Sequence, residues 1–276
     1  MDHEYSIAEL KHLATEVRRD VLRSITAAGS GHPGGSLSAA DIMTALYFRE
    51  ANLTSPTDPL RDRVFWSKGH VVPLLYALLA NKGFLPKEEL LTLRKFGSRL
   101  QGHPKKDSPP GVETSGGSLG QGLSIAVGAA YAARYDHSPA RVYCLNGDGE
   151  LQEGQIWEAL MAGAHFKLDN LCTIIDSNGL QIDGKVADVM GLGDLAAKVA
   201  AFGWHVIEID GGDMQQCVDA LEEAKTVKGQ PTAIIAHTIK GRGVSYMEDQ
   251  AGWHGKAPSQ DELAQALREL DAQEGE

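Results

Sequence analysis

Two short polar segments combine residue types that can hold a metal ion and a phosphorylated ligand. The first is Gly-Asp-Gly at 147–149, directly after the apolar run 142–145, and the second is Asn178, just after the apolar run 171–175. Carboxylate and amide oxygens are hard ligands that suit Mg²⁺ or Ca²⁺. Two side chains do not complete an octahedron, and Mg²⁺ usually adds phosphate oxygens and water. The two segments therefore indicate a metal-bound phosphorylated ligand.

The glycines beside Asp148 favour the same interpretation. Because Gly147 and Gly149 lack a Cβ atom, backbone N–H groups at this turn can approach a ligand closely. A helix expected at 156–164 would add its positive N-terminal end. Gly-Asp-Gly and Asn-Gly are also common in plain turns. Their position after two successive strands is what favours a binding site.

The patterns that must position these segments predict an α/β fold. Apolar residues at helical spacing, followed by a strand-helix-strand unit, predict a parallel sheet with helices on both faces. In such sheets, ligands bind beyond the carboxyl ends of the strands. Helices are expected at 6–28, 38–47, 71–81, 87–95, 123–134, 156–164, 214–227 and from 261 onward, with strands at 142–145, 171–175, 205–209 and 232–236.

Length and composition indicate one globular domain spanning 1–276, with a helical approach segment at about 1–110 and the core sheet at about 111–276. The net charge of −11 argues against a nucleic-acid surface. The longest apolar stretch, near 71–80, is too short to span a membrane, and no leader pattern begins the chain. Cys144, Cys172 and Cys217 lack a paired spacing and are expected to be buried thiols. A cytoplasmic location is therefore expected.

The spacing of the two polar segments resembles the thiamine-diphosphate motif of the transketolase family, with 28 residues between Gly149 and Asn178. Further blocks are similar to transketolase blocks in the same order, and together they cover nearly the whole chain. They are SGHPG (30–34), SKGH (67–70), GHP (102–104), GVETSGGSLGQG (111–122), NGLQIDG (178–184), GWHVIEIDG (203–211) and WHGKAP (253–258). The resemblance implies the fold of the transketolase domain that binds the diphosphate of thiamine diphosphate.

The resemblance also implies a metal and cofactor site. Asp148, Asn178 and the backbone carbonyl of Leu180 would bind Mg²⁺, for which Ca²⁺ or Mn²⁺ could substitute. The residues implied to contact thiamine diphosphate are His70, Gly117, Leu119, Gly149, Asn178, Ile182 and His254.

Four of the ten histidines lie in loops flanked by Gly or Pro, namely His32, His70, His103 and His254. Imidazoles titrate in the range needed for proton transfer to and from sugar hydroxyls, and they donate hydrogen bonds to phosphate oxygens. The resemblance implies that His70 contacts the cofactor diphosphate. It implies that His32 and His103 face the substrate hydroxyls and that His254 bridges the two sides, which makes His32, His103 and His254 the candidate catalytic residues.

Transketolases are expected to be more than twice as long as this chain. Their pyrimidine-binding and C-terminal domains, with the glutamate that protonates the aminopyrimidine, have no counterpart here. The resemblance therefore implies a subunit that transfers a two-carbon ketol unit between sugar phosphates only with a second subunit carrying those domains. The expected assembly is α2β2, with no nucleic-acid or membrane partner.

Other functions remain open from the sequence. The sugar could be an unusual ketose, branched or sulfonated, and the chain could be a catalytically silent paralogue that binds the cofactor for regulation. A deoxyxylulose-phosphate synthase is disfavoured by WHGKAP and GVETSGGSLGQG. A generic Mg²⁺-nucleotide protein is disfavoured because the P-loop and dinucleotide-binding sequences are absent.

Overall fold

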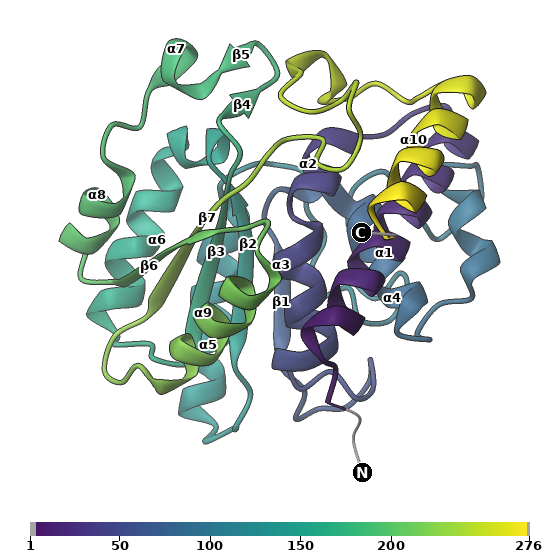
Figure 1. Cartoon of the computed structure of the whole chain (residues 1–276). Coiled ribbons are helices and arrows are strands. Elements are labelled where there is room, and N and C mark those ends of the chain that lie inside the picture. The colour runs from purple at the N-terminus through teal and green to yellow at the C-terminus, as the bar shows by residue number, and fades with distance from the viewer. Residues whose placement is uncertain (1–3, 275–276) are drawn as a thin grey trace.

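A five-stranded parallel sheet runs through the computed structural model, which describes residues 4–274 (Figure 1). The strand order is β1-β2-β3-β7-β6, so the chain crosses over between β3 and β7. Parallel pairing places Gly147 beside Asp176, and the two polar segments predicted to form a site therefore leave the same edge of the sheet. The strands are β1 (Arg63–Trp66), β2 (Val142–Gly147), β3 (Leu171–Ser177), β6 (His205–Asp210) and β7 (Thr232–His237).

Helices cover both faces of this sheet, which confirms the predicted fold class. Alternate residues of β2 enter two different cores: Tyr143 and Leu145 pack with α1, α3, α4 and α9, whereas Val142 and Cys144 pack with α5, α6 and α8. A hairpin of β4 (Leu180–Gln181) and β5 (Gly184–Lys185) follows β3. The helices are α1 (Ile7–Ala28), α2 (Pro33–Ser38), α3 (Ala40–Ala45), α4 (Val72–Asn81), α5 (Gln121–Tyr135), α6 (Gly154–His165), α7 (Val186–Met190), α8 (Leu195–Ala201), α9 (Met214–Thr226) and α10 (Gln260–Gln273).

Helix α1 leads the chain into the loop that carries His32. Ser6 and Glu9 form a capping box at its start, which satisfies backbone N–H groups that have no partner inside the helix. Gly29 ends the helix with φ of 63°, a left-handed conformation that glycine adopts without steric cost. The break predicted after residue 28 is confirmed.

Several elements differ from the sequence-based predictions, which gave no element for the β4–β5 hairpin, α7 or α8. The helix predicted at 38–47 is interrupted: α2 starts earlier at Pro33, α3 follows, and a π-helical turn runs over Leu46–Glu50. The helix predicted at 87–95 is a 3-10 turn, Lys87–Thr92, in which only Leu90 is buried and little packing favours a longer helix. Strand β1 was not predicted, because only three of its residues, Val64, Phe65 and Trp66, are apolar, and so short a run is weak evidence for a strand.

The three cysteines are free and buried, as predicted. Cys144 and Cys172 lie on neighbouring strands, and burial raises the pKa of each thiol. Within residues 4–274, no helix is both long and apolar enough to cross a membrane.

Truncation of the central strand should weaken the fold. Ile174 on β3 is fully buried, so Ile174→Ala should lower the free energy of unfolding by about 2–5 kcal/mol through lost burial and the cavity left behind. Val189→Ala at an exposed position should change it by less than about 0.5 kcal/mol. Urea denaturation followed by circular dichroism measures both. Equal stability of the two variants would contradict this packing.

Candidate functional site

A cavity of about 400 Å³ opens at the carboxyl ends of β1, β2, β3 and β7. Loops that follow each of these strands meet there, as expected for an open α/β sheet. The structure brings every site residue named from the sequence into the wall of this one cavity. They are His32, His70, His103, Gly117, Leu119, Asp148, Gly149, Asn178, Leu180, Ile182 and His254.

Asp148 is buried and held in one orientation by backbone donors. Its Oδ1 accepts from the Gly149 N–H at 2.8 Å, and its Oδ2 accepts from the Gly179 N–H at 2.6 Å. Burial, with the nearby Asp176 carboxylate, raises the pKa of Asp148 to about 6. A bound cation would offset the cost of holding this carboxylate ionised away from water.

Asn178 and Leu180 supply the two other oxygens of the predicted metal site. The Asn178 side-chain amide donates to Asp176 Oδ2 at 3.0 Å, and its Oδ1 accepts from the Leu180 N–H at 3.1 Å. A carboxylate, an amide oxygen and a backbone carbonyl form the all-oxygen donor set that Mg²⁺ prefers. Among residues 4–274, no group of three or more His, Cys, Asp or Glu side chains could hold a metal.

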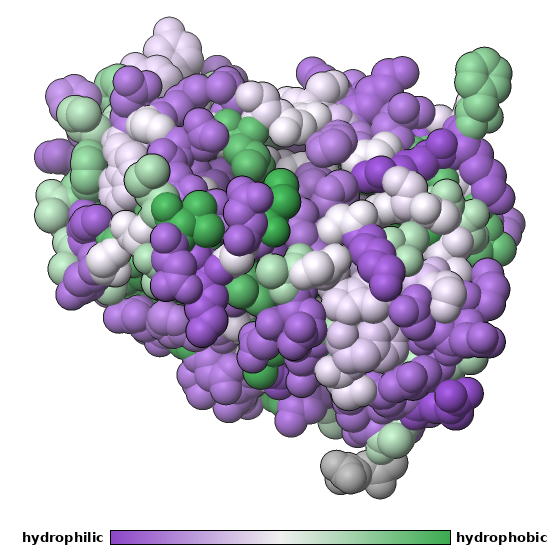
Figure 2. All heavy atoms as spheres, turned by 90° about the horizontal axis from the view of Figure 1, so that it is seen from above, coloured by the Kyte–Doolittle hydropathy of each residue, from purple (hydrophilic) through white to green (hydrophobic). Residues whose placement is uncertain are grey.

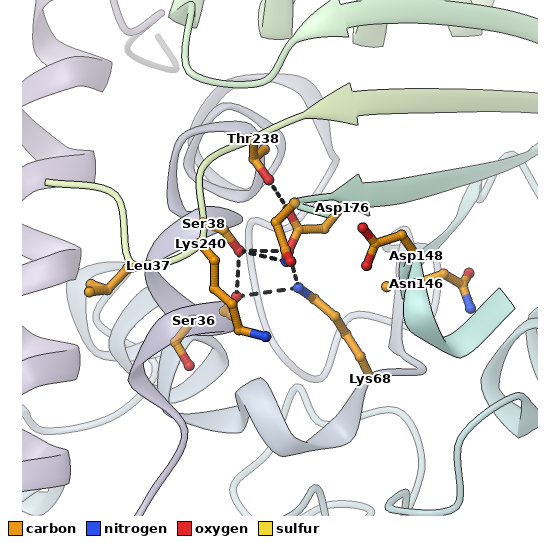
Figure 3. Close-up of polar contacts among 12 residues, drawn as sticks. Ser36, Leu37, Ser38, Lys68, Asn146, Asp148, Asp176, Thr238 and Lys240 are labelled. Atoms are coloured by element: carbon orange, nitrogen blue, oxygen red, sulfur yellow. Dashed lines mark hydrogen bonds and ion pairs between the residues drawn. The ribbon is translucent and has the colours of Figure 1, made fainter. Parts of the chain in front are cut away.

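Asp176 lies beneath this site and joins four segments of the chain (Figure 3). It is fully buried and accepts from Ser38 Oγ at 2.6 Å, as well as from Lys68 Nζ and Thr238 Oγ1. Burial alone would raise the pKa of Asp176, but the Lys68 ammonium and the hydroxyl donors lower it overall. The carboxylate thus remains charged and fixes the amide of Asn178 with its nitrogen toward Asp176.

Glu150 performs a similar role on the other side of the cavity. Its carboxylate accepts from Ser67 Oγ, from the Gly120 N–H at 2.8 Å and from the Gly147 N–H at 3.1 Å. These donors come from the loop after β1, the turn before α5 and the end of β2. A single buried carboxylate therefore holds together three segments of the cavity wall.

The four loop histidines form one cluster. The ring centroid of His32 lies 5.2 Å from that of His70, 5.5 Å from that of His254 and 6.3 Å from that of His103. Burial lowers the pKa of each ring, to about 4 for His32 and about 3 for His254. The pKa range of a free imidazole, which was assumed from the sequence, therefore does not apply to these four rings. They are neutral at pH 7.

Lys240 follows β7 and brings an unpaired positive charge to the cavity. It is 2% exposed, and its ammonium donates to the Leu180 carbonyl and to His254 Nδ1, both at 2.9 Å. Within residues 4–274 it forms no ion pair with a carboxylate. Burial, with repulsion from Lys68, lowers the pKa of Lys240 to about 8. A buried cation with only neutral partners is suited to an anionic ligand.

Sequence reasoning missed Lys68, Glu150, Asp176 and Lys240. The first three lie inside or next to motifs that were recognised, but no role was assigned to them there. Lys240 precedes a glycine and lies four residues beyond the predicted strand at 232–236. The rule that ligands bind at the carboxyl ends of strands could have found it.

Comparison with known proteins identifies the family of this fold and cavity. The family model described as "Transketolase, thiamine diphosphate binding domain" matches residues 10–274. The chain belongs to this family. Human transketolase is 43% identical over 274 residues, which are 98% of this chain and 43% of that protein. The chain thus spans less than half the length of the transketolases that it matches.

Other relatives of this transketolase-family chain have about its own length. One of them, a subunit of the apulose-4-phosphate transketolase of Phocaeicola vulgatus, is 43% identical over 92% of this chain and 90% of that protein. The 6-deoxy-6-sulfo-D-fructose transketolase subunit of a Clostridium species is 43% identical over 95% of this chain and 96% of that protein. Among solved structures, transketolase from Leishmania mexicana superposes with a TM-score of 0.88 at 32% identity, covering 99% of this chain and 42% of that one.

The buried ion pair beneath the cavity should be energetically coupled. Asp176→Asn keeps the shape of the side chain but leaves the Lys68 charge unpaired, which should lower the free energy of unfolding by about 3–5 kcal/mol. Lys68→Met should cost a comparable amount, because it leaves the carboxylate without its cation. The double variant should lose less than the sum of the two, by at least about 0.5 kcal/mol. Denaturation of the four proteins in urea measures this, and strictly additive losses would contradict the pairing.

Proposed function

We propose that the chain is the diphosphate-binding subunit of a two-chain transketolase that depends on thiamine diphosphate and Mg²⁺. The observation that carries this proposal is the arrangement of Asp148, Asn178 and Leu180 beside the unpaired Lys240. It offers oxygen ligands for a divalent cation and a buried ammonium for a diphosphate in one cavity. The family match supports thiamine diphosphate as the ligand.

In this proposal, Asp148, Asn178 and the Leu180 carbonyl would hold Mg²⁺, and Ca²⁺ or Mn²⁺ could substitute for it. Lys240 and His70 contact the diphosphate, with the Gly149 backbone close by. Gly117, Leu119 and Ile182 lie toward the rings of the cofactor. When bound, thiamine diphosphate supplies the carbon nucleophile and electron sink that C–C cleavage of a ketose requires.

The histidine cluster forms the substrate side of the same cavity. His32, His103 and His254 are neutral, so each ring can donate one hydrogen bond and accept another. Neutral imidazoles that line a half-buried cavity can bind the hydroxyl and carbonyl oxygens of a sugar phosphate without carrying a charge of their own. His254, which is hydrogen-bonded to Lys240, lies between the substrate side and the diphosphate side of the cavity.

A second chain is proposed to complete the active site. The relatives named as transketolase subunits have about the length of this chain, which supports a split enzyme. Apolar side chains at the rim of the cavity, Leu119 and Ile182, are 36% and 70% exposed, and a partner surface would cover them. We propose that this partner carries the pyrimidine-binding and C-terminal domains and that two such pairs form α2β2. The three buried thiols suit the reducing cytoplasm.

The proposed reaction transfers a two-carbon ketol unit from a ketose phosphate to an aldose phosphate. The two subunit relatives are named for apulose 4-phosphate and for a sulfonated fructose, which favours a branched or sulfonated ketose as a second candidate donor. A silent regulatory paralogue is disfavoured, because Asp148, Asn178 and His70 are all present in the cavity.

Reconstitution tests the proposed function. The chain should be purified by itself, the candidate second subunit by itself, and the two together, each with thiamine diphosphate and Mg²⁺. Ketol transfer should be measured with pentose, branched and sulfonated ketose donors. We expect activity only in the mixture, because the proposed cofactor site is shared between the two chains. Full activity from this chain without the other, or none with any donor in a stable complex, would overturn the proposal.

Removal of the metal carboxylate should abolish Mg²⁺-dependent cofactor binding. In the two-chain complex, Asp148→Ala should show no heat of thiamine diphosphate binding that depends on Mg²⁺ in calorimetric titration. Asp188→Ala changes an exposed carboxylate of α7 and serves as the matched control, with wild-type affinity expected. Unchanged affinity in Asp148→Ala would refute the metal assignment.

Lys240→Met should weaken cofactor binding while Mg²⁺ still binds. Loss of one hydrogen bond between charged groups costs roughly 1.5–3 kcal/mol, which corresponds to about a 10- to 100-fold rise in the Kd for thiamine diphosphate. The Kd for thiamine, which has no phosphate, should change by less than about threefold. A rise of similar size for both ligands would place Lys240 away from the diphosphate.

A further inference from the structure

Arg94 joins two loops on the substrate side of the cavity. Its guanidinium donates to Ser30 Oγ at 2.7 Å, contacts His32 Nδ1 at 3.3 Å and donates to the Gly102 carbonyl at 3.4 Å. Ser30 and His32 belong to the loop after α1, whereas Gly102 precedes His103. One side chain thus connects the segments that carry two of the four cavity histidines.

The backbone at Arg94 and at Gly102 has features that accommodate the Arg94 side chain. Arg94 has φ of 58°, in the left-handed region that non-glycine residues rarely adopt. A Cβ atom on Gly102 would lie 2.8 Å from Arg94 Nε, so a side chain at this position would displace the guanidinium. Such unfavourable conformations persist where surrounding contacts hold them, and they are frequent at functional sites.

The chemistry of the Arg94 guanidinium and the His32 imidazole decides which of the two donates the hydrogen bond. A guanidinium has five N–H donors and no acceptor, and it stays protonated in proteins. The Arg94 contact therefore requires His32 Nδ1 to be the acceptor, and a neutral ring must then carry its proton on Nε2. Within residues 4–274, no protein group forms a hydrogen bond with His32 Nε2, while the ring lines the cavity.

We propose that Arg94 is a positioning residue that sets the tautomer of His32 and so makes His32 a hydrogen-bond donor to a substrate oxygen. In this tautomer the nitrogen that is free to meet a ligand is already protonated, so it cannot accept a proton from a sugar hydroxyl. That this oxygen belongs to a ketose rests on the proposed function. The assignment of the His32 tautomer does not depend on the proposed function.

The surroundings of His32 support a ring that stays neutral. Arg94, Lys240 and the rings of His70, His103 and His254 are the titratable and charged groups that face it or act on it. Each of them is either a cation or a neutral ring. Burial first, and then Arg94, lowers the pKa of His32, and the ring therefore keeps the Nε2–H form from pH 8 down to about pH 5.

Nitrogen NMR of the full chain tests the tautomer directly. Two-bond ¹H–¹⁵N spectra of the uniformly ¹⁵N-labelled protein should show the Nε2–H pattern for His32, assigned by its loss in His32→Asn. In Arg94→Met the same signal should shift toward a mixture of tautomers and titrate closer to the ordinary pKa of about 6.5. Arg99→Met serves as the matched control: Arg99 lies in the same loop but pairs with Glu89 outside the cavity, and its removal should leave the His32 signal unchanged.

A wild-type His32 with its proton on Nδ1, or an unchanged His32 signal in Arg94→Met, would overturn the proposal. If Arg94→Met does not fold, Arg94→Gln takes its place, because a neutral amide can accept as well as donate and no longer fixes which nitrogen of His32 carries the proton. In the two-chain enzyme, Arg94→Met should lower kcat about 10-fold and move the His32 ionisation in the kcat profile to higher pH, because burial still lowers the pKa but the Arg94 charge no longer does. Absence of ketol transfer in the wild type would refute the proposed function and leave the NMR result standing.

Discussion

The buried ion pair between Lys68 and Asp176 is the interaction on which the cavity depends. A carboxylate with no solvent exposure is tolerable only because a cation and several hydroxyl and amide donors surround it. Those donors come from α2, from the loops after β1 and β7, and from Asn178, so the same contacts that stabilise the charge also bring four segments together (Figure 3). The orientation of the Asn178 amide follows from this arrangement.

Three cations lie in or beside the cavity, although the molecule as a whole is acidic. The chain carries a net charge of −11, yet Lys68, Lys240 and Arg94 lie in or beside the cavity, and all four of its histidines are neutral. Figure 2 shows hydrophilic side chains over most of the face seen from above, with a few apolar ones among them. The cavity wall also carries the carboxylates of Asp148, Glu150, Glu153 and Asp183. An anionic ligand is therefore favoured locally by a bound cation and by Lys240, which forms no ion pair with a carboxylate among residues 4–274. Hydrogen-bonded cations also determine the tautomers of two histidine rings, because Arg94 contacts His32 Nδ1 and Lys240 contacts His254 Nδ1.

The sequence was sufficient for the fold class and for the residues gathered in the cavity, and insufficient for the contacts that position them. Strands β2 and β3 are apolar runs that end in polar turns, and the Gly-Asp-Gly segment together with the transketolase-like blocks contains all the predicted cavity residues. Strand β1 is too short to recognise, and the helix predicted at 38–47 is broken by tertiary packing that no local pattern records. The partners of Asp176 and Arg94 lie as far as 138 and 64 residues away along the chain, so only the folded structure shows them. The lowered pKa values of the histidines follow from burial, which the sequence does not reveal.

A structure of the two-chain complex with thiamine diphosphate and Mg²⁺ is the most direct test of the central claim, that this chain holds the diphosphate end of a shared cofactor. The account predicts the metal on Asp148, Asn178 and the Leu180 carbonyl, the diphosphate beside Lys240 and His70, and the aminopyrimidine ring against the second chain. A cofactor bound with its diphosphate on the second chain, or enclosed entirely by this one, would contradict it.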